Sequence, residues 1–227
     1  MIRFVFFDLD DTIFDFKKAE AKAVSATLSE LGIIPDEKIV SKYSEINASM
    51  WRRLEKGELT RGEVLVNRFA VLFSELGVER DTYKTKEMYE KNLSVGHYFI
   101  DGAYQMLENL YGKYKLYLVS NGTLSVQQGR LKSSSIEKFF DGIFISEQLG
   151  FVKPQKEFFD LVFEKIYDFD KSQAIIVGDS LSSDIKGGNN AGIKTCWFNP
   201  KHLQNDTDAN IDYEIHALNE IYGVLEN

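Results

Sequence analysis

The chain has 227 residues, 44% of them hydrophobic and 27% charged, with a formal net charge of −8. These values are ordinary for a globular protein, and the acidic balance excludes a nucleic-acid polymer as a partner because such binding needs a basic face. A small anionic ligand is not excluded, since a bound metal ion and one well-placed lysine can invert the local field.

The N-terminal segment is an apolar run, residues 2–7, that stops at Asp8. This pattern favours a buried parallel strand, and it is too short for a signal peptide or a membrane span. We therefore expect no membrane association. Cys196 is the only cysteine, so no intramolecular disulfide can form, and a cytoplasmic location is predicted.

Residues 17 to 95 show helical periodicity and no strand signal comparable to the first. Glycines follow two of the apolar stretches, at Gly32 and Gly77, where they are typical helix stops. The predicted helices cover residues 19–31, 39–54 and 64–76, followed by a weaker stretch that ends at residue 93.

Beyond residue 100 short apolar strands alternate with helices, which is the pattern of an α/β, Rossmann-like doubly wound parallel sheet. We predict the core at residues 1–14 and 98–227, interrupted by a helical domain at residues 15–97. The later strands are predicted at residues 116–119, 142–145, 174–177 and 194–198. The later helices are predicted at residues 101–111, 124–134, 155–166, 182–191 and 216–226.

The first strand ends in two acidic residues, Asp8 and Asp10, which alternation directs to the same side. Two close carboxylates need a proton or a cation between them, and Mg²⁺ is a hard ion that takes oxygen ligands. A solvated acidic turn or a helix N-cap would explain the same residues.

Polar residues also follow two later segments of the predicted core. Ser120 and Asn121 end the second strand, where a hydroxyl and backbone N–H groups can meet a phosphate oxygen; a turn that uses Asn-Gly is the alternative. Lys153 precedes Pro154 at a helix start, where it can pair with phosphate and carboxylates, although taken on its own it is better explained as a surface lysine.

A second acidic pair follows the fourth strand, at Asp179 and Asp184. Asp179 can complete a metal site, and Asp184 can support it without contacting the ion; helix capping is the alternative explanation of Asp179. The four motifs occur in the order Asp-x-Asp, Ser, Lys and Gly-Asp, each beside a predicted strand end or helix start. This combination is far more specific than any one of them.

These motifs resemble those of the haloacid dehalogenase superfamily of phosphatases. The matching segments are residues 7–13, 119–122, 153–154 and 178–184. The resemblance implies a Rossmann-like core, a mobile C1-type helical cap and Mg²⁺-dependent phosphoryl transfer. Residues 123–131, 145–154 and 190–199 resemble bacterial pyrimidine 5′-nucleotidases of the YjjG type, which implies a pyrimidine nucleoside 5′-monophosphate as the small phosphorylated substrate.

The resemblance also implies roles for the acidic residues. Asp8 would attack phosphorus and form an aspartyl-phosphate, while Asp10 would protonate the leaving oxygen and then activate water. Mg²⁺ would be held by Asp8, the Asp10 backbone carbonyl and Asp179. Asp184 would position a metal-bound water or the lysine of the third motif.

The remaining positions of the motifs would bind phosphate or shape the site. Ser120 and Lys153 would hold the phosphoryl oxygens, assisted by backbone N–H groups near Leu9 and Asn121. Thr12 would shape the turn or bond to Asp10, and Asp11 is interpreted as solvent-facing or as a local turn acceptor. Contacts to a base or sugar are considered for Phe14, Phe16, Trp51 and Arg52, with packing inside the cap as the alternative.

Three other activities fit parts of this pattern. A dehalogenase on the same fold needs neither the acid at Asp10 nor a metal, so Asp10 and Asp179 argue against it. A phosphatase or phosphomutase acting on a sugar phosphate uses the same acid pair and stays open. A phosphoaspartate receiver module would be about half as long and would carry its acidic pair on different strands. The sequence does not determine the oligomeric state.

Overall fold

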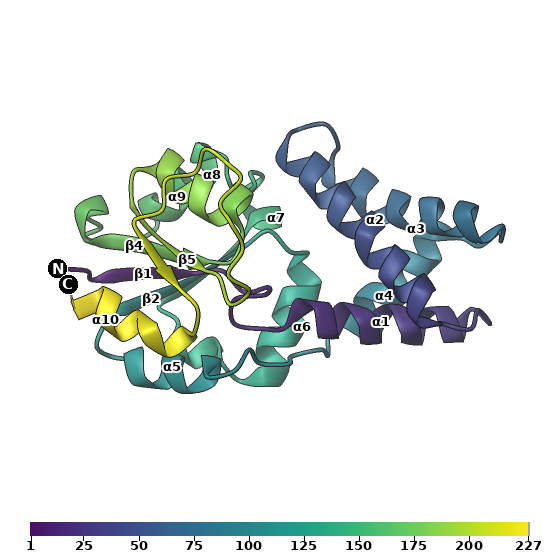
Figure 1. The fold of residues 1–227 in the computed structure, drawn as a ribbon, viewed down its shortest axis with the longest axis horizontal. Coiled ribbons are helices and arrows are strands. Elements are labelled where there is room, and N and C mark those ends of the chain that lie inside the picture. Colours follow the sequence, from purple (N-terminus) through teal and green to yellow (C-terminus); the bar gives the residue numbers. More distant parts are fainter. Residues whose placement is uncertain (227) are drawn as a thin grey trace.

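A computed structural model describes residues 1–226, which are built around a parallel six-stranded sheet (Figure 1). The strand order is β3-β2-β1-β4-β5-β6, and every neighbouring pair runs parallel. The strands are β1 (Phe4–Phe7), β2 (Lys115–Ser120), β3 (Gly142–Ile145), β4 (Ala174–Gly178), β5 (Lys194–Phe198) and β6 (Tyr213–Ile215). The strand order reverses between β1 and β4, and sheets of this kind bind ligands beyond the carboxyl ends at that point.

Helices cover both faces of the sheet because both faces of β1 are apolar. Val5 and Phe7 point into one hydrophobic cluster, and Phe4 and Phe6 point into another on the opposite face. The first cluster is covered by α5 (Ala103–Leu110), α6 (Leu124–Ser134) and α10 (Ile221–Glu226). The second is covered by α8 (Lys156–Glu164) and α9 (Lys186–Ala191), above the sheet in Figure 1.

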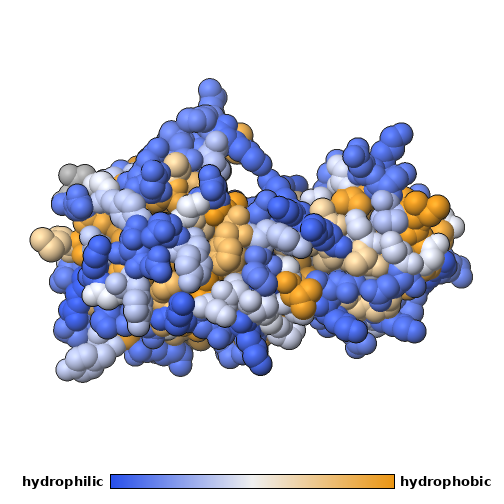
Figure 2. All heavy atoms as spheres, turned by 90° about the horizontal axis from the view of Figure 1, so that it is seen from below, coloured by the Kyte–Doolittle hydropathy of each residue, from blue (hydrophilic) through white to orange (hydrophobic). Residues whose placement is uncertain are grey.

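Four helices between β1 and β2 form a separate part of the molecule, on the right of Figure 1. They are α1 (Phe16–Glu30), α2 (Glu37–Glu55), α3 (Arg61–Leu76) and α4 (Thr82–Leu93). Their own hydrophobic cluster includes the stacked rings of Tyr43 and Phe69, 5.2 Å between centroids, and the ring of Tyr89. Figure 2 shows a largely hydrophilic surface that is notched where this part meets the sheet.

Side chains that accept hydrogen bonds from the first turn fix where each of these four helices begins. Asp15, Asp36, Thr60 and Asp81 supply these caps, and Thr60 forms a reciprocal capping box with Glu63. Such caps satisfy backbone N–H groups that have no partner within the helix. The start of α3 is therefore well defined, and it faces the sheet.

The parallel sheet with an inserted helical block confirms the predicted fold class. The five predicted strands are present, and β6 is an additional strand of three residues at the sheet edge. The helix predicted from residue 182 begins as a π-helical turn, Leu181–Ile185, and the one predicted from residue 216 begins as a 3₁₀ turn, Leu218–Glu220. Asn227, the last residue of the predicted core, lies outside the described residues.

The remaining elements are short: α7 (Ser146–Leu149) and the 3₁₀ turns Glu137–Phe139 and Lys171–Gln173. Among residues 1–226, none of the helices has the length and apolarity needed to cross a bilayer.

Candidate active site

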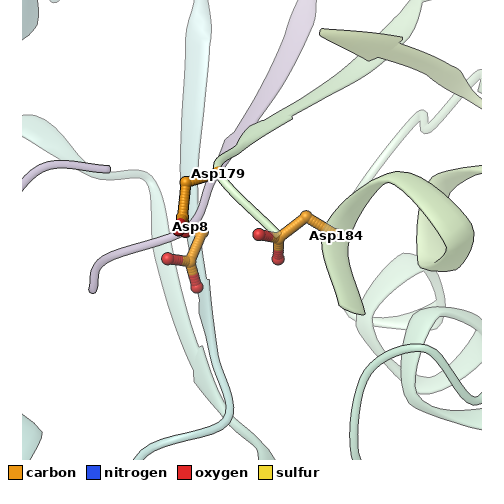
Figure 3. Close-up of side chains that lie close together, drawn as sticks. All are labelled: Asp8, Asp179 and Asp184. Atoms are coloured by element: carbon orange, nitrogen blue, oxygen red, sulfur yellow. The ribbon is translucent and has the colours of Figure 1, made fainter. Parts of the chain in front are cut away.

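Three carboxylates meet beyond the carboxyl ends of β1 and β4, which are adjacent in the sheet (Figure 3). Asp8 follows β1 and Asp179 follows β4, while Asp184 comes from the π-helical turn after β4. Each residue offers an oxygen within 4.8 Å of the other two. The backbone N–H of Asp8 donates to the carbonyl of Val177 (3.0 Å), which extends the β1–β4 ladder to the first of the carboxylates.

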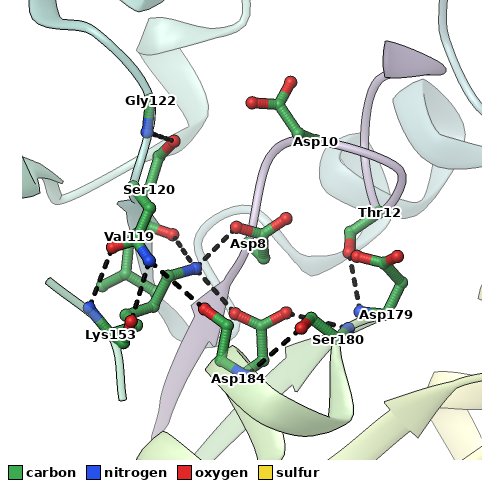
Figure 4. Close-up of polar contacts among 12 residues, drawn as sticks. Asp8, Asp10, Thr12, Val119, Ser120, Gly122, Lys153, Asp179, Ser180 and Asp184 are labelled. Carbon is green, nitrogen blue, oxygen red and sulfur yellow. Dashed lines mark hydrogen bonds and ion pairs between the residues drawn. The ribbon is translucent and has the colours of Figure 1, made fainter. Parts of the chain in front are cut away.

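Lys153 lies among these acids with only 1% of its surface exposed. Its Nζ donates to Oδ1 of Asp8 (2.6 Å), to Oδ1 of Asp184 (2.6 Å) and to the carbonyl of Val119 (2.9 Å), as Figure 4 shows. All three hydrogens of the ammonium group are thereby used. Burial lowers the pKa of Lys153, but the charges of Asp184 and Asp8 outweigh burial and raise the pKa above its ordinary value. The lysine is therefore a fixed positive charge.

One lysine does not balance three carboxylates. Burial raises the pKa of Asp8 to about 8, with Lys153 opposing the shift. Burial also raises the pKa of Asp179 well above its ordinary value, and the charges of Asp184 and Asp8 add to the increase. Clustered carboxylates that resist ionisation in this way are stabilised by a cation, and an all-oxygen donor set suits a hard divalent ion. The donor set of this site therefore fits Mg²⁺.

The predicted threonine and serine line the same loops. The hydroxyl of Thr12, which is fully buried, accepts from the backbone N–H of Asp179 (3.1 Å) and so ties the first motif to the fourth. The Ser120 hydroxyl accepts from the N–H of Gly122 (3.1 Å) and from Nε2 of Gln127 (3.0 Å). Ser120 thus sits at the end of β2 beside the cluster (Figure 4).

Asn121 lines the site, but its side-chain amide forms hydrogen bonds with the backbone of Lys153. Its Oδ1 accepts from the N–H of Lys153 (2.8 Å), and its Nδ2 donates to the carbonyl of Lys153 (2.9 Å). Asn121 therefore aligns the backbone that carries the lysine. Asp11 accepts from the N–H of Phe16 (3.0 Å) with a backbone φ of 60°, so it is a local turn acceptor.

The Asp10 side chain points away from the three-carboxylate cluster (Figure 4). Its Oδ2 accepts from Nε2 of Gln127 (2.7 Å), and its Oδ1 forms an ion pair with Nη1 of Arg130. Both partners lie on α6 and are almost completely buried. Gln127 and Arg130 are not among the site residues that the sequence predicts. The signal available was the spacing of Gln127 and Arg130, three residues apart and therefore on one face of a helix that follows the second motif.

The helical part contacts these loops directly. Arg61, the first residue of α3, donates to the carbonyls of Asn121 (2.9 Å) and Gly122 (3.3 Å) and to the hydroxyl of Ser146 (2.5 Å). Arg61 was not predicted as a site residue either. An arginine that follows a helix N-cap carries no sequence signal for partners that are distant in the chain.

A cavity of about 460 Å³ lies between the sheet and the helical part, within the size range of small-molecule sites. Phe16, Trp51 and Arg52 line this cavity, as considered for contacts to a leaving group. Phe14 does not; it is completely buried in the sheet cluster, with its ring 5.2 Å from that of Phe99. Packing is therefore the role of Phe14.

Comparison with known proteins identifies the family. Residues 5–198 match the model of the haloacid dehalogenase-like hydrolases. This chain belongs to that family. It is 42% identical to the HAD-hydrolase YfnB of Bacillus subtilis over 98% of this chain and 95% of that protein. It is 36% identical to the pyrimidine 5′-nucleotidase PynA of Streptococcus pneumoniae, over 99% and 95% of the two chains.

Two further comparisons bear on sequence and fold. The pyrimidine 5′-nucleotidase YjjG of Escherichia coli is 28% identical over 97% of this chain and 96% of its own. A crystal structure of Bacillus subtilis YfnB, described as bound to magnesium and as revealing interdomain movement, superposes with a TM-score of 0.95, covering 100% of this chain and 99% of that one. The resemblance to haloacid dehalogenase-like hydrolases found in the sequence is thus confirmed, and the chain is a hydrolase of that family.

Proposed function

We propose that this haloacid dehalogenase-like hydrolase is a Mg²⁺-dependent phosphomonoesterase that acts through an aspartyl-phosphate on a pyrimidine nucleoside 5′-monophosphate. The observation that carries the proposal is the buried group of Asp8, Asp179, Asp184 and Lys153 beside a cavity. Phosphoryl transfer depends mainly on positioning and on charge neutralisation, and this group supplies both. The similarity to PynA and YjjG supports the nucleotide as substrate.

In this mechanism Asp8 is the nucleophile. Lys153 donates to Oδ1 of Asp8, which leaves Oδ2 to attack phosphorus. The Ser120 hydroxyl donates to a phosphoryl oxygen, and the phosphoryl oxygens are bound beside Lys153 by the positive charge of its ammonium group, whose hydrogens stay on Asp8, Asp184 and the Val119 carbonyl. Asp10 donates a proton to the departing oxygen and later takes one from the water that hydrolyses the aspartyl-phosphate.

Asp8, Asp179 and the Asp10 backbone carbonyl would hold Mg²⁺. Asp184 would position a metal-bound water without binding the ion directly, and it also forms the ion pair that holds Lys153 in place. When bound, the ion supplies positive charge that neutralises the phosphoryl oxygens. Residues 15–97 are proposed to act as a cap that moves to admit substrate and closes to exclude water, an assignment that the interdomain movement described for YfnB supports.

A sugar phosphate is the second candidate substrate. Glyceraldehyde 3-phosphate phosphatase of Pyrococcus abyssi is 28% identical over 100% of this chain. A phosphomutase uses the same acid pair and would return phosphorylated product. A receiver module is disfavoured, since the helical block covers the acidic site. Because Cys196 is buried and is the only cysteine, a reducing compartment fits the chain, and we place the enzyme in the cytoplasm.

The test is phosphate release from a panel of nucleoside monophosphates and sugar phosphates, with Mg²⁺ and with a chelator. Pyrimidine monophosphates are expected to turn over fastest, only with Mg²⁺. Asp8→Asn should reduce turnover by at least about 10³-fold, since the amide cannot attack phosphorus. Sugar phosphates turning over faster than every nucleotide would refute the substrate assignment, and activity in Asp8→Asn would refute the mechanism.

A further inference from the structure

The side-chain amide of Gln127, on α6, joins two parts of the candidate site. Its Nε2 donates to Oδ2 of Asp10 (2.7 Å) and to the Ser120 hydroxyl (3.0 Å), and its Oε1 accepts from Nη1 of Arg130 (3.0 Å). Asp10 lies in the loop after β1 and Ser120 ends β2, so one nitrogen atom bridges the ends of two neighbouring strands. In the proposed mechanism these two residues are the acid at the departing oxygen and a donor to the phosphoryl group.

The partners of this amide determine its orientation. Asp10 presents carboxylate oxygens, which only accept hydrogen bonds, and Arg130 presents a guanidinium group, which only donates them. A flipped amide would therefore place its oxygen against the carboxylate and its nitrogen against the guanidinium group. Gln127 is only 1% exposed, so it is shielded from water that could replace these bonds. Both hydrogens of Nε2 are thus used, one for each partner.

The residue that lies against this amide is a glycine. A β-carbon at Gly122 would lie 2.1 Å from Nε2 of Gln127, far closer than the contact distance of two unbonded heavy atoms. The backbone N–H of Gly122 also donates to the Ser120 hydroxyl (3.1 Å). Gly122 therefore leaves room for the amide and donates to one of the same acceptors, so the loop after β2 is shaped around Gln127.

These bonds restrict what the two partners of Gln127 can do. The Ser120 hydroxyl has two lone pairs and one hydrogen, and the N–H groups of Gln127 and Gly122 occupy both lone pairs. Its hydrogen is left to donate to a phosphoryl oxygen. On Asp10, Gln127 holds Oδ2 while Arg130 holds Oδ1, which fixes the plane of the carboxyl group. Each of these oxygens keeps a lone pair on which a proton can reside.

We propose that Gln127 is a positioning residue that fixes the acid, Asp10, and the phosphate-binding hydroxyl of Ser120 relative to each other. The inference rests on the proposed phosphatase mechanism. Proton transfer to the departing oxygen requires the acid and the phosphoryl group to be held in one geometry, and small displacements of such groups reduce rates by large factors. Since both of its amide hydrogens are used, Gln127 acts through Asp10 and Ser120 and not on the substrate itself.

The test compares two substrates that differ in whether the leaving group needs a proton. One is the best alkyl phosphate of the wild type, expected to be uridine 5′-monophosphate, whose sugar oxygen departs with the proton of Asp10. The other is p-nitrophenyl phosphate, whose leaving group departs as a stable phenolate. Because kcat/KM reports the steps up to this departure, the ratio of the two kcat/KM values, alkyl over nitrophenyl ester, measures the contribution of the acid. Inorganic phosphate, used as a competitive inhibitor, reports on the phosphoryl site separately.

Gln127→Met keeps the size of the side chain and removes both hydrogens of the amide. The ratio should fall about tenfold to a hundredfold because Asp10 is no longer held. The inhibition constant of phosphate should rise about threefold, because the Ser120 hydroxyl is then free to turn away. Gln128→Met is the matched control, since it changes an exposed glutamine at the next position of α6, and it should leave both quantities unchanged.

A ratio or an inhibition constant in Gln127→Met equal to that of the wild type would overturn the proposal. An unfolded fraction lowers both activities by the same factor and alters neither quantity, so misfolding does not imitate the expected result. If thermal melting shows that Gln127→Met does not fold, Gln127→Asn decides. It keeps an amide but is one methylene too short to reach both acceptors, and it should show the same two changes. A wild type that releases phosphate from no ester would instead refute the proposed function.

Discussion

Arg130 shows at the level of a single residue how this site combines buried charge with fixed geometry. Its side chain is completely buried, yet it bonds at once to Asp10, to Gln127 and to the carbonyl of Gly96 in the segment that returns from α4 to the core. Removing one partner of a buried ion pair leaves an uncompensated charge and is strongly destabilising. Arg130 thus holds the Asp10 side chain in place and also contacts the segment that links α4 to the sheet.

Replacing Arg130 with methionine should therefore impair catalysis through Asp10. Without the ion pair the carboxylate is no longer fixed, and kcat/KM for a nucleotide should fall about a hundredfold, equivalent to about 2.7 kcal/mol. The matched control is Lys132→Met, which removes an exposed cation from the same helix and should change activity little. Steady-state kinetics decide the point: equal activity in the two variants would show that Asp10 does not depend on Arg130.

At the level of elements, the start of α3 joins the helical insertion to the loop that follows β2. Arg61 binds the carbonyls of Asn121 and Gly122, directly after β2, and its guanidinium lies 5.5 Å from the ring of Trp51. Burial lowers the pKa of Arg61 from its ordinary value, so its position costs desolvation. The hydrogen bonds to the carbonyls of Asn121 and Gly122 offset part of this cost.

Arg61→Ala should consequently shift the insertion toward open states. We expect the KM of the best substrate to rise about tenfold, the equivalent of about 1.4 kcal/mol, with a smaller change in kcat. Arg53→Ala removes an exposed arginine of α2 that pairs with Glu58 at the surface, and it serves as the control. A KM unchanged in Arg61→Ala, measured by phosphate release, would show that this contact does not help to hold the insertion closed.

The sequence predicted elements well where burial is continuous and poorly where it is local. β1 and β4 are buried at every position, so their apolar runs are unambiguous. β6 has only three residues, and Glu214 at its centre is exposed, so no apolar run reveals it. The π-helical turn before α9 follows helical periodicity closely enough to be mistaken for α-helix.

The residues of the candidate site also divide into those that a local sequence pattern predicts and those that it does not. The motif residues Asp8, Lys153 and Asp179 were predicted because each follows a strand or precedes a helix. The pairing of Asp10 with Arg130 joins residues 120 positions apart, and no local pattern encodes such a contact. Contacts between the helical insertion and the sheet depend on how two separately packed parts meet, and hydrophobic periodicity along the chain does not describe this.

For the whole molecule, the two hydrophobic clusters of the sheet and the separate cluster of the insertion leave the functional cavity at their boundary. The charge of the protein is −8, and the acids are also crowded at this boundary, where Asp8, Asp179 and Asp184 share Lys153. An anionic substrate would be repelled from such a site without a cation. In the proposed mechanism, folding, metal binding and catalysis are therefore linked through the same carboxylates.

This linkage predicts how the stability of the metal-free protein depends on pH. The pKa of Asp8 is raised from 3.8 to about 8 in the folded state, so between these values the folded state binds more protons than the unfolded state. Because stability falls with rising pH wherever the folded state binds more protons, this site should destabilise the protein progressively from about pH 4 to about pH 8. The raised pKa of Asp179 acts in the same direction.

Mg²⁺ competes with those protons, so its effect on the melting temperature should be larger at pH 8 than at pH 5. Calorimetry with Mg²⁺ or with a chelator measures the difference at each pH. Asp179→Asn should raise the melting temperature of the metal-free protein at pH 8, because it removes one of the crowded charges, and should weaken the response to Mg²⁺. A magnesium shift of equal size at both pH values, or one retained in full by Asp179→Asn, would mean that the ion binds elsewhere and that Asp8 and Asp179 are not its ligands.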